Sequence, residues 1–238
     1  MGFELQFAPV LAEIPLLMQG LWLTIELSLS AICLGGCVGL LAAIAHNVLS
    51  DRRRWIIDVY VELIRNTPFL VQLYLIFFGL PELGIRVSAV SAGLIAMTIN
   101  LGAYATEIFR AGIESVHPSQ IEAALSLALT RRQIFRHVVL APAVARVWPS
   151  LVSQFTLIML TSSVCSFISV EELSGVASLI QSNTFRSFEV YIVVAILYLA
   201  LALALRGGLM LLGHVLFSRR PGSRRVALRT AVSSGRSV

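Results

Sequence analysis

The stretch that decides the fold is 119–133, which reads Ser119-Gln120-Ile121-Glu122-Ala123-Ala124-Leu125-Ser126-Leu127-Ala128-Leu129-Thr130-Arg131-Arg132-Gln133. Ser119 and Glu122 have the S-x-x-E spacing of a capping box, and Thr130 and Gln133 repeat it as T-x-x-Q. This pattern predicts one short helix from Gln120 to Ala128 and a second running from Thr130 toward Leu140. Proline cannot continue a helix interior, so Pro142 is expected to end the second helix.

Outward from this stretch, the chain is strongly apolar. Of its 238 residues, 57% are hydrophobic and 13% are charged, and the mean hydropathy is +0.86. Soluble domains carry about 25% charged residues, so the composition predicts an all-α integral membrane protein. A helix needs about 20 apolar residues to cross a bilayer. Five spans are predicted, at about 19–45, 58–80, 88–113, 149–168 and 189–212.

The arginines predict how these spans are oriented. They concentrate in the loop after the first span, in the loop 114–146 and in the tail 217–238, whereas the opposite loops hold mainly glutamates. The positive-inside rule places arginine-rich loops in the cytoplasm. We therefore expect an extracytoplasmic segment 1–16, a transmembrane domain 17–216 and a basic cytoplasmic tail 217–238, with the N-terminus periplasmic.

Several classes of chemistry are excluded or disfavoured by residue type. The chain has no lysine, so it has neither a Walker A phosphate loop nor a Schiff-base lysine. Cys33, Cys37 and Cys165 lie in apolar stretches, where cysteine acts as a small hydrophobic residue. The four histidines are scattered and form no HExxH motif. We expect no catalytic residue, no bound metal, no cofactor on this chain and no nucleic-acid partner.

Polar residues inside the spans are candidates for either packing or transport. Glu62 with Arg65, and Glu107 with Arg110, are each three residues apart and predict ion pairs on one helix face. Residues near the membrane centre are candidates for a translocation path, with interhelical hydrogen bonding as the alternative. They are Gln72, Asn100, Thr161, Ser162 and Ser163, together with Glu26 in the first span.

Four blocks of sequence, in order, resemble a known family. Glu122-Ala123-Ala124 followed by Leu127 is similar to the EAA loop of type I ABC import permeases. The stretches 60–72, 103–113 and 166–186 resemble the polar amino acid subfamily, of the histidine and glutamine permease type. The resemblance covers about Leu17 to Leu216, nearly the whole chain.

The resemblance implies a type I ABC importer transmembrane fold, in a bacterial inner membrane, that moves a polar amino acid into the cytoplasm. It implies two ATPase subunits, which bind the ATP and magnesium, a periplasmic solute-binding protein and a second permease, identical or homologous. The residues expected to couple to the ATPase are Ser119, Gln120, Glu122, Ala123, Ala124, Leu127 and Thr130.

The sequence departs from the family pattern at three places. Ala128 stands where the family has a glycine suited to a left-handed turn, so we expect that turn to be built differently. Pro142 comes one residue later than the family's Leu-Pro pair. Residues 160–163 replace a Lys-Asp-Thr-Ser pattern with Leu-Thr-Ser-Ser, which favours a partner permease that retains the specificity residues.

Two other interpretations stay open at this stage. An ion-gradient-driven amino acid carrier would need proton or sodium ligands at mid-membrane, where the sequence offers only neutral polar groups. A membrane scaffold without transport activity would not need two capped helices in its largest loop. The short helix after Ser119 could also lie on the bilayer surface instead of docking to a partner.

Overall fold

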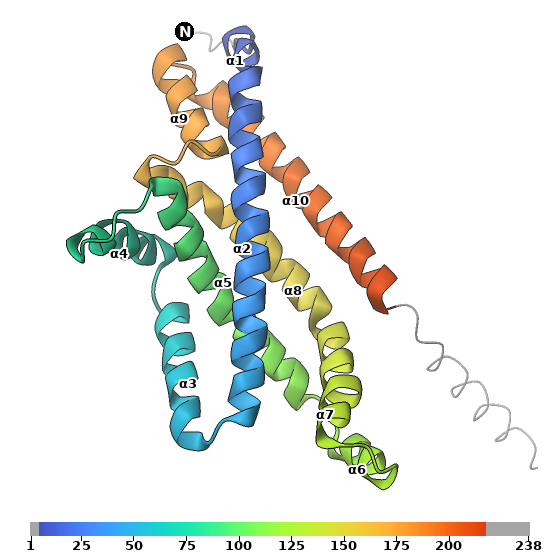
Figure 1. Cartoon of the computed structure of the whole chain (residues 1–238). Coiled ribbons are helices and arrows are strands. Elements are labelled where there is room, and N and C mark those ends of the chain that lie inside the picture. The colour runs from blue at the N-terminus through green and yellow to red at the C-terminus, as the bar shows by residue number, and fades with distance from the viewer. Residues whose placement is uncertain (1–4, 218–238) are drawn as a thin grey trace, which may run out of the picture.

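The computed structural model describes residues 5–217, which form helices and no strand (Figure 1). This confirms the predicted all-α class. The α-helices are α1 (Ala8–Ala12), α2 (Ile14–Val48), α3 (Asp51–Arg65), α4 (Phe69–Glu82), α5 (Ala89–Glu114), α6 (Pro118–Ser126), α7 (Arg131–Gln133), α8 (Ala141–Thr161), α9 (Leu173–Thr184) and α10 (Ser187–Phe217). A π-helical segment, Ile134–Leu140, precedes α8, and a 3-10 segment, Ser162–Ile168, follows it. The predicted tail lies outside the described residues, apart from Phe217.

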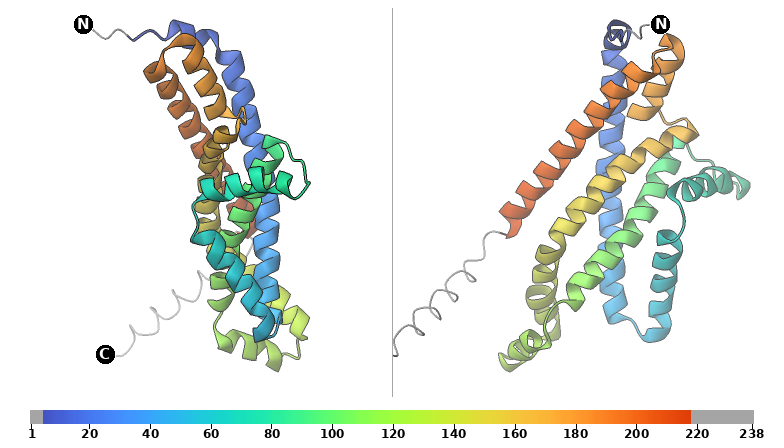
Figure 2. Two further views of the ribbon diagram at one scale, coloured as in Figure 1. Left: turned by 90° about the vertical axis from the view of Figure 1, so that its left-hand side faces the viewer. Right: turned by 180° about the vertical axis from the view of Figure 1, so that it is seen from behind.

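The long helices run between two ends of an elongated bundle. One end holds α1, α9 and the start of α10, and the other holds α6, α7 and the connection from α2 to α3 (Figure 1). The two further views agree on this separation (Figure 2). We call these the α9 end and the α6 end. Helices distant in the sequence, such as α1 and α9, thus lie together at the same end.

The core is centred on α5, which packs directly against α2. At this contact a Cβ added to Gly35 would lie 2.8 Å from the Leu101 Cβ, and one added to Gly39 would lie 2.5 Å from the Ala105 Cβ. Such spacing leaves no room for a side chain on α2, so the two backbones approach closely. Dispersion contacts between close backbones are a main source of helix association in membranes, where lipid tails are as apolar as the helix surfaces.

The predicted second span, 58–80, is not one straight helix. Within residues 5–217, four segments are long and apolar enough to cross a membrane: α2, α5, Arg131–Ile168 and α10. A fifth exists only if α3 and α4, which are bent by 106° at their junction, are counted as one broken span. Pro68 disfavours helical backbone in the residue before it, here Thr67, and α3 accordingly ends at Arg65 with Asn66 as its C-cap.

The predicted end of the second loop helix at Pro142 is also wrong. α7 continues through the π-helical segment into α8, so the fourth apolar segment starts at Arg131 instead of residue 149. Pro142 occupies the first turn of α8. The N–H that proline lacks thus falls where the π-helical hydrogen-bond register changes to the α-helical one, and a π-helical turn is a place where a helix accommodates such an irregularity.

Candidate functional site

At the α6 end, the short helix α6 begins two residues earlier than predicted. Its N-cap is His117, whose Nδ1 accepts a hydrogen bond from the Ser119 backbone N–H at 3.2 Å, and Pro118 is its first residue. Ser119 therefore does not cap the helix, and the Ser119–Glu122 capping box is not formed. Proline presets the φ angle that a helix start needs. Pro118 was the sequence signal for this boundary.

The other end of α6 is closed by a left-handed turn, despite the absence of glycine. Ala128 has φ 55°, and the N–H groups of Ala128 and Leu129 donate to the carbonyls of Leu125 and Ala124 at 2.9 and 3.2 Å. This pair of hydrogen bonds is a Schellman motif. The expectation that the turn is built differently is thus wrong, because Ala128 adopts the conformation normally given to glycine.

The capping box at the start of α7 is confirmed. The Gln133 N–H donates to Thr130 Oγ1 at 3.4 Å, and the Thr130 N–H donates to Gln133 Oε1 at 2.9 Å. The stretch between Ala128 and Gln133 is therefore fixed by backbone hydrogen bonds at its first end and by the side chains of the capping box at its second end. α6 and the turn after it, residues 118–130, project from the bundle as a finger (Figure 1).

Most of the residues predicted to couple lie on the exposed surface of this finger. Ala124 is 4% exposed and packs on the core together with Ile121, so it is not available to a partner. Leu125 and Leu127 are 54% and 75% exposed, an apolar pair unusual at a solvated surface. Exposed beside them are Ser119, Gln120, Glu122, Ala123 and Thr130.

The finger is fastened to two long helices by one arginine. Arg146 of α8 donates from Nη1 to the carbonyl oxygen of Ser115 at 2.6 Å and to Ser115 Oγ at 2.5 Å. Ser115 is the C-cap of α5 and lies three residues before α6 begins. The contact therefore joins α8 to the end of α5, next to the start of α6. Arg146 is not among the residues predicted to couple, because its partner Ser115 lies 31 positions away in the chain.

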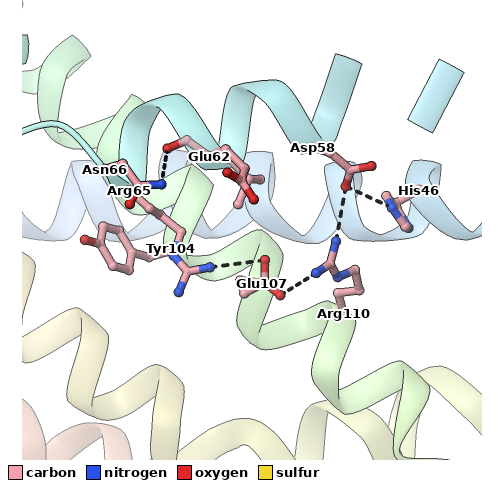
Figure 3. Close-up of a pocket in the computed structure, with 9 residues that line it drawn as sticks. His46, Asp58, Glu62, Arg65, Asn66, Tyr104, Glu107 and Arg110 are labelled. Atoms are coloured by element: carbon pink, nitrogen blue, oxygen red, sulfur yellow. Dashed lines mark hydrogen bonds and ion pairs between the residues drawn. The ribbon is translucent and has the colours of Figure 1, made fainter. Parts of the chain in front are cut away.

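A chain of charged side chains joins α2, α3 and α5 near the same end (Figure 3). His46 Nε2 lies 3.1 Å from Asp58 Oδ1, and Arg110 Nη1 lies 3.2 Å from the same oxygen. Arg110 Nη2 contacts Glu107 Oε1 at 2.6 Å, and Arg65 Nη1 contacts Glu107 Oε2 at 3.2 Å. Single exposed pairs contribute little free energy, but this network fixes α3 against α5.

The network confirms one predicted ion pair and replaces the other. Glu107 and Arg110 pair within α5 as predicted. Arg65 instead reaches across to Glu107, and its guanidinium lies 5.5 Å from the centre of the Tyr104 ring. Glu62 consequently has no ion-pair partner within residues 5–217. Spacing along one helix could not show that a neighbouring helix offers Arg65 a closer carboxylate.

Two of the candidate translocation residues are brought together in the middle of the bundle. Asn100 Nδ2 donates to Gln72 Oε1 at 3.0 Å, and both side chains are buried. Gln72 Nε2 donates to the carbonyls of Ile64 and Thr67 at 2.7 and 3.0 Å. Gln72 thus satisfies backbone groups that the α3–α4 break leaves without helical partners.

The remaining candidates form local hydrogen bonds elsewhere. Thr161, Ser162 and Ser163 each donate to a carbonyl three or four residues earlier in the chain. Glu26 accepts from the Trp22 indole N–H at 2.8 Å on the exposed surface of α2. Their part in a translocation path stays a prediction. Within residues 5–217, no three His, Cys, Asp or Glu side chains lie together as a metal site would require.

At the α9 end, sequence reasoning missed a buried carboxylate. Glu172 is fully buried and caps α9 by accepting from the N–H groups of Ser174 and Gly175 at 2.8 and 3.0 Å. Thr24 of α2 and Tyr198 of α10 also donate to it, at 3.2 and 2.5 Å. Burial raises the pKa of Glu172, and these hydrogen bonds oppose the rise. Glutamate is not among the residues preferred at an N-cap, so no local pattern identified Glu172.

With this geometry in view, comparison with known proteins identifies the family. Residues 35–213 match the family described as binding-protein-dependent transport system inner membrane component. The chain belongs to this family. The probable glutamine ABC transporter permease protein GlnM of Bacillus subtilis (strain 168) is 36% identical over 191 residues, 80% of this chain and 88% of the relative. The glutamine transport system permease protein GlnP of Escherichia coli (strain K12) is 32% identical over 204 residues, 85% and 93% of the two chains.

Comparison with solved structures supports the same family assignment. A chain from the crystal structure of an amino acid ABC transporter with histidines is 36% identical, has a TM-score of 0.82, and is matched over 89% of this chain and 99% of its own. A chain from the MetNI methionine ABC transporter, 17% identical with a TM-score of 0.73, shares the fold over 86% of this chain and 98% of its own. The chain is therefore a permease with the type I ABC importer fold.

Proposed function

We propose that this permease imports a polar amino acid, driven by ATPase subunits that dock on α6. The observation that carries the proposal is the exposed finger itself. It presents Glu122, Leu125 and Leu127 to the outside while Arg146 fastens its base to α5 and α8. A short helix with exposed apolar residues fits a groove on a partner. The amino acid class is supported by the relatives named as glutamine permeases.

The orientation proposed from the arginines is supported by where the helices lie. Arg52–Arg54 begin α3 and Arg131–Arg132 begin α7, and both segments lie at the α6 end (Figure 1). The positive-inside rule makes that end cytoplasmic, where ATP is available. The α9 end, with the N-terminal segment, is then periplasmic and faces a solute-binding protein.

A second permease, identical or homologous, completes the proposed assembly. α4 points sideways out of the bundle (Figure 2), and its Val71, Leu75 and Phe78 are 46%, 68% and 60% exposed. Such a surface is covered by lipid or by another apolar helix. Two permeases around a two-fold axis would enclose a path and carry one ATPase each. ATP binding and hydrolysis, with magnesium, belong to those ATPases.

In this mechanism, movement of the docked ATPases shifts the permease between inward-open and outward-open states. Docking drives transport only to the extent that the ATPase binds the two states with different affinity. The Arg146–Ser115 contact supplies the proposed link, because it ties α8 to the end of α5 at the point where the chain enters α6. Alternating access then occurs as these long helices change their packing.

Docking is tested by replacing Glu122 with arginine and measuring how much ATPase co-purifies with the permease. Glu122→Arg reverses charge on the exposed face of α6 and makes no change to the core, so co-purified ATPase is expected to fall by more than about tenfold. Glu82→Arg is the matched control, because Glu82 is an exposed carboxylate at the end of α4. Equal ATPase recovery from both variants would contradict docking on α6.

A further inference from the structure

The charged network at the α6 end surrounds a cavity that the mechanism above does not use. The cavity has a volume of about 560 Å³ and lies between α2, α3 and α5 (Figure 3). Small-molecule sites generally occupy about 300–1,000 Å³. The groups that face it and enter the argument below are Glu62, Arg65, Asn66, Tyr104, Glu107 and Arg110.

Some of these groups already have their charge satisfied. Arg110 contacts three carboxylates, those of Asp58, Glu107 and Glu114, at 3.2, 2.6 and 3.7 Å. Glu107 is held between Arg110 and Arg65, with one oxygen on each. These three ion pairs and the Arg65 contact form the wall of the cavity and leave little hydrogen-bonding capacity for a ligand.

Other groups on the same wall have hydrogen-bonding atoms that no other residue in the described part of the chain uses. Among the described residues, the Glu62 carboxylate and the Tyr104 hydroxyl form no hydrogen bond, and the Asn66 amide uses only its Nδ2, on the Glu62 carbonyl at 2.8 Å. Arg65 uses only Nη1 on Glu107, so its other N–H groups are available. Arg65, the last residue of α3, and Asn66, its C-cap, follow Glu62 by three and four residues, so both lie near Glu62 along the cavity.

From this set of unused groups, we propose that the cavity binds the α-amino and α-carboxylate groups of an amino acid. Glu62 and the Asn66 side-chain oxygen are acceptors that suit an ammonium group, and Arg65 with the Tyr104 hydroxyl are donors that suit a carboxylate. Because these groups contact only the ammonium and the carboxylate that all α-amino acids share, the site tolerates different side chains.

Charge argues against other classes of ligand. A phosphate or nucleotide would lie beside Asp58, Glu62 and Glu107, and a simple cation would lie beside Arg65 and Arg110. Like charges at such distances disfavour either ligand. A zwitterion can place its ammonium group against the carboxylates and its own carboxylate against the guanidinium groups. The mixed composition of the wall is therefore the feature that selects an amino acid.

The cavity also continues the polar side of α5. Asn100, Tyr104 and Glu107 are four and three residues apart, so they follow one another along a single face of the helix. This face runs from the Gln72–Asn100 pair in the middle of the bundle to the α6 end. The assignment rests on the proposed orientation, in which the α6 end is cytoplasmic, and makes the cavity an amino-acid site on the exit side.

The test is a binding measurement on the full-length permease in lipid nanodiscs, with whatever subunits co-purify and without nucleotide. Isothermal titration compares L-glutamine with glutaramate, which is glutamine lacking its α-amino group. Glu62→Gln removes one charge and no internal contact, so the variant is expected to fold. Asp51→Asn is the matched control, because Asp51 is an exposed carboxylate on the same helix that does not line the cavity.

Glu62→Gln is expected to weaken glutamine binding by at least about tenfold, because hydrogen bonds to charged groups contribute most to such contacts. It should leave glutaramate binding unchanged, and Asp51→Asn should resemble the wild type with both ligands. Unchanged glutamine binding, an equal loss for both ligands, or no glutamine binding to the wild type would overturn the proposal. Since no ATP is present, none of these outcomes depends on ATPase docking.

Discussion

At the scale of single residues, Ala128 shows how tightly the end of α6 is specified. Its φ of 55° lies in the left-handed region, where a Cβ comes close to the following carbonyl oxygen at a cost of about 1–2 kcal/mol. The two Schellman hydrogen bonds from Ala128 and Leu129 hold it there. Leu129 also packs on the same core cluster as Ala124, as the hydrophobic contact of this motif requires.

Replacing Ala128 with glycine is therefore expected to stabilise α6. The glycine removes the steric cost but makes the unfolded chain more flexible, so the net gain is about 1 kcal/mol. Hydrogen exchange of the α6 amides should slow roughly fivefold, since about 1 kcal/mol changes an opening equilibrium by that factor. Ala123→Gly, in the helix interior, should instead speed exchange. Faster exchange in Ala128→Gly would contradict the conformation assigned to this turn.

At the scale of helices, α2 and α5 depend on small residues for their contact. Ala31, Gly35, Gly39 and Ala43 recur every four residues on α2 and are all buried. This spacing places them on one face, where backbones approach closely and pack by dispersion. Gly36, one residue along from Gly35, lies off this stripe and has open space around it up to the Phe155 ring, 3.8 Å away.

Gly39→Ala and Gly36→Ala form a matched pair that tests this contact. An alanine at residue 39 would meet the backbone of Ala105 and Thr106 at 2.9 Å, so the helices must separate at a cost of about 1–3 kcal/mol. An alanine at residue 36 makes only ordinary contact. Thermal unfolding in detergent should show a lower midpoint for Gly39→Ala alone. Equal midpoints for the two variants would show that α2 and α5 do not pack this closely.

The existence of the long helices could be predicted from sequence, whereas their breaks and continuations could not. Hydropathy alone located α2, α5 and α10, because a membrane requires long uninterrupted apolar helices. The break at Pro68 depends on Gln72 reaching back to the carbonyls of Ile64 and Thr67. The passage of the helix through Pro142 depends on where the first turn of α8 falls. Both are decided by local hydrogen bonding that periodicity does not report.

The candidate site also combines features that could be predicted from the sequence with features that could not. The Thr130 capping box could be predicted, since capping is a local interaction, whereas the predicted Ser119–Glu122 box is replaced by the His117 cap. Arg146 on Ser115, and Arg65 on Glu107, join residues more than 30 positions apart in the chain. Such partners are set by helix packing, so the sequence placed Arg65 beside Glu62 by spacing alone. The arrangement of groups in the cavity at the α6 end depends on this pairing of Arg65 with Glu107 instead of Glu62.

At the scale of the whole molecule, the bundle links its α6 end to its centre through two sets of contacts. Arg146 ties the finger to α5 and α8, and the network through Glu107 and Arg110 ties α5 to α3. α3 leads into the break that Gln72 closes beside Asn100. Contacts are thus continuous from α6 to the middle of the bundle, and they are the route that the proposed coupling would use.

The most direct test of this account is amino acid uptake into proteoliposomes that contain the purified transporter and enclosed ATP. Ionophores are added to collapse proton and sodium gradients, and Glu122→Arg is compared with the wild type. The account predicts that the wild type continues to take up amino acid and that Glu122→Arg does not, although its bundle remains folded. Uptake that stops when the gradients collapse, or that survives in Glu122→Arg, would contradict it.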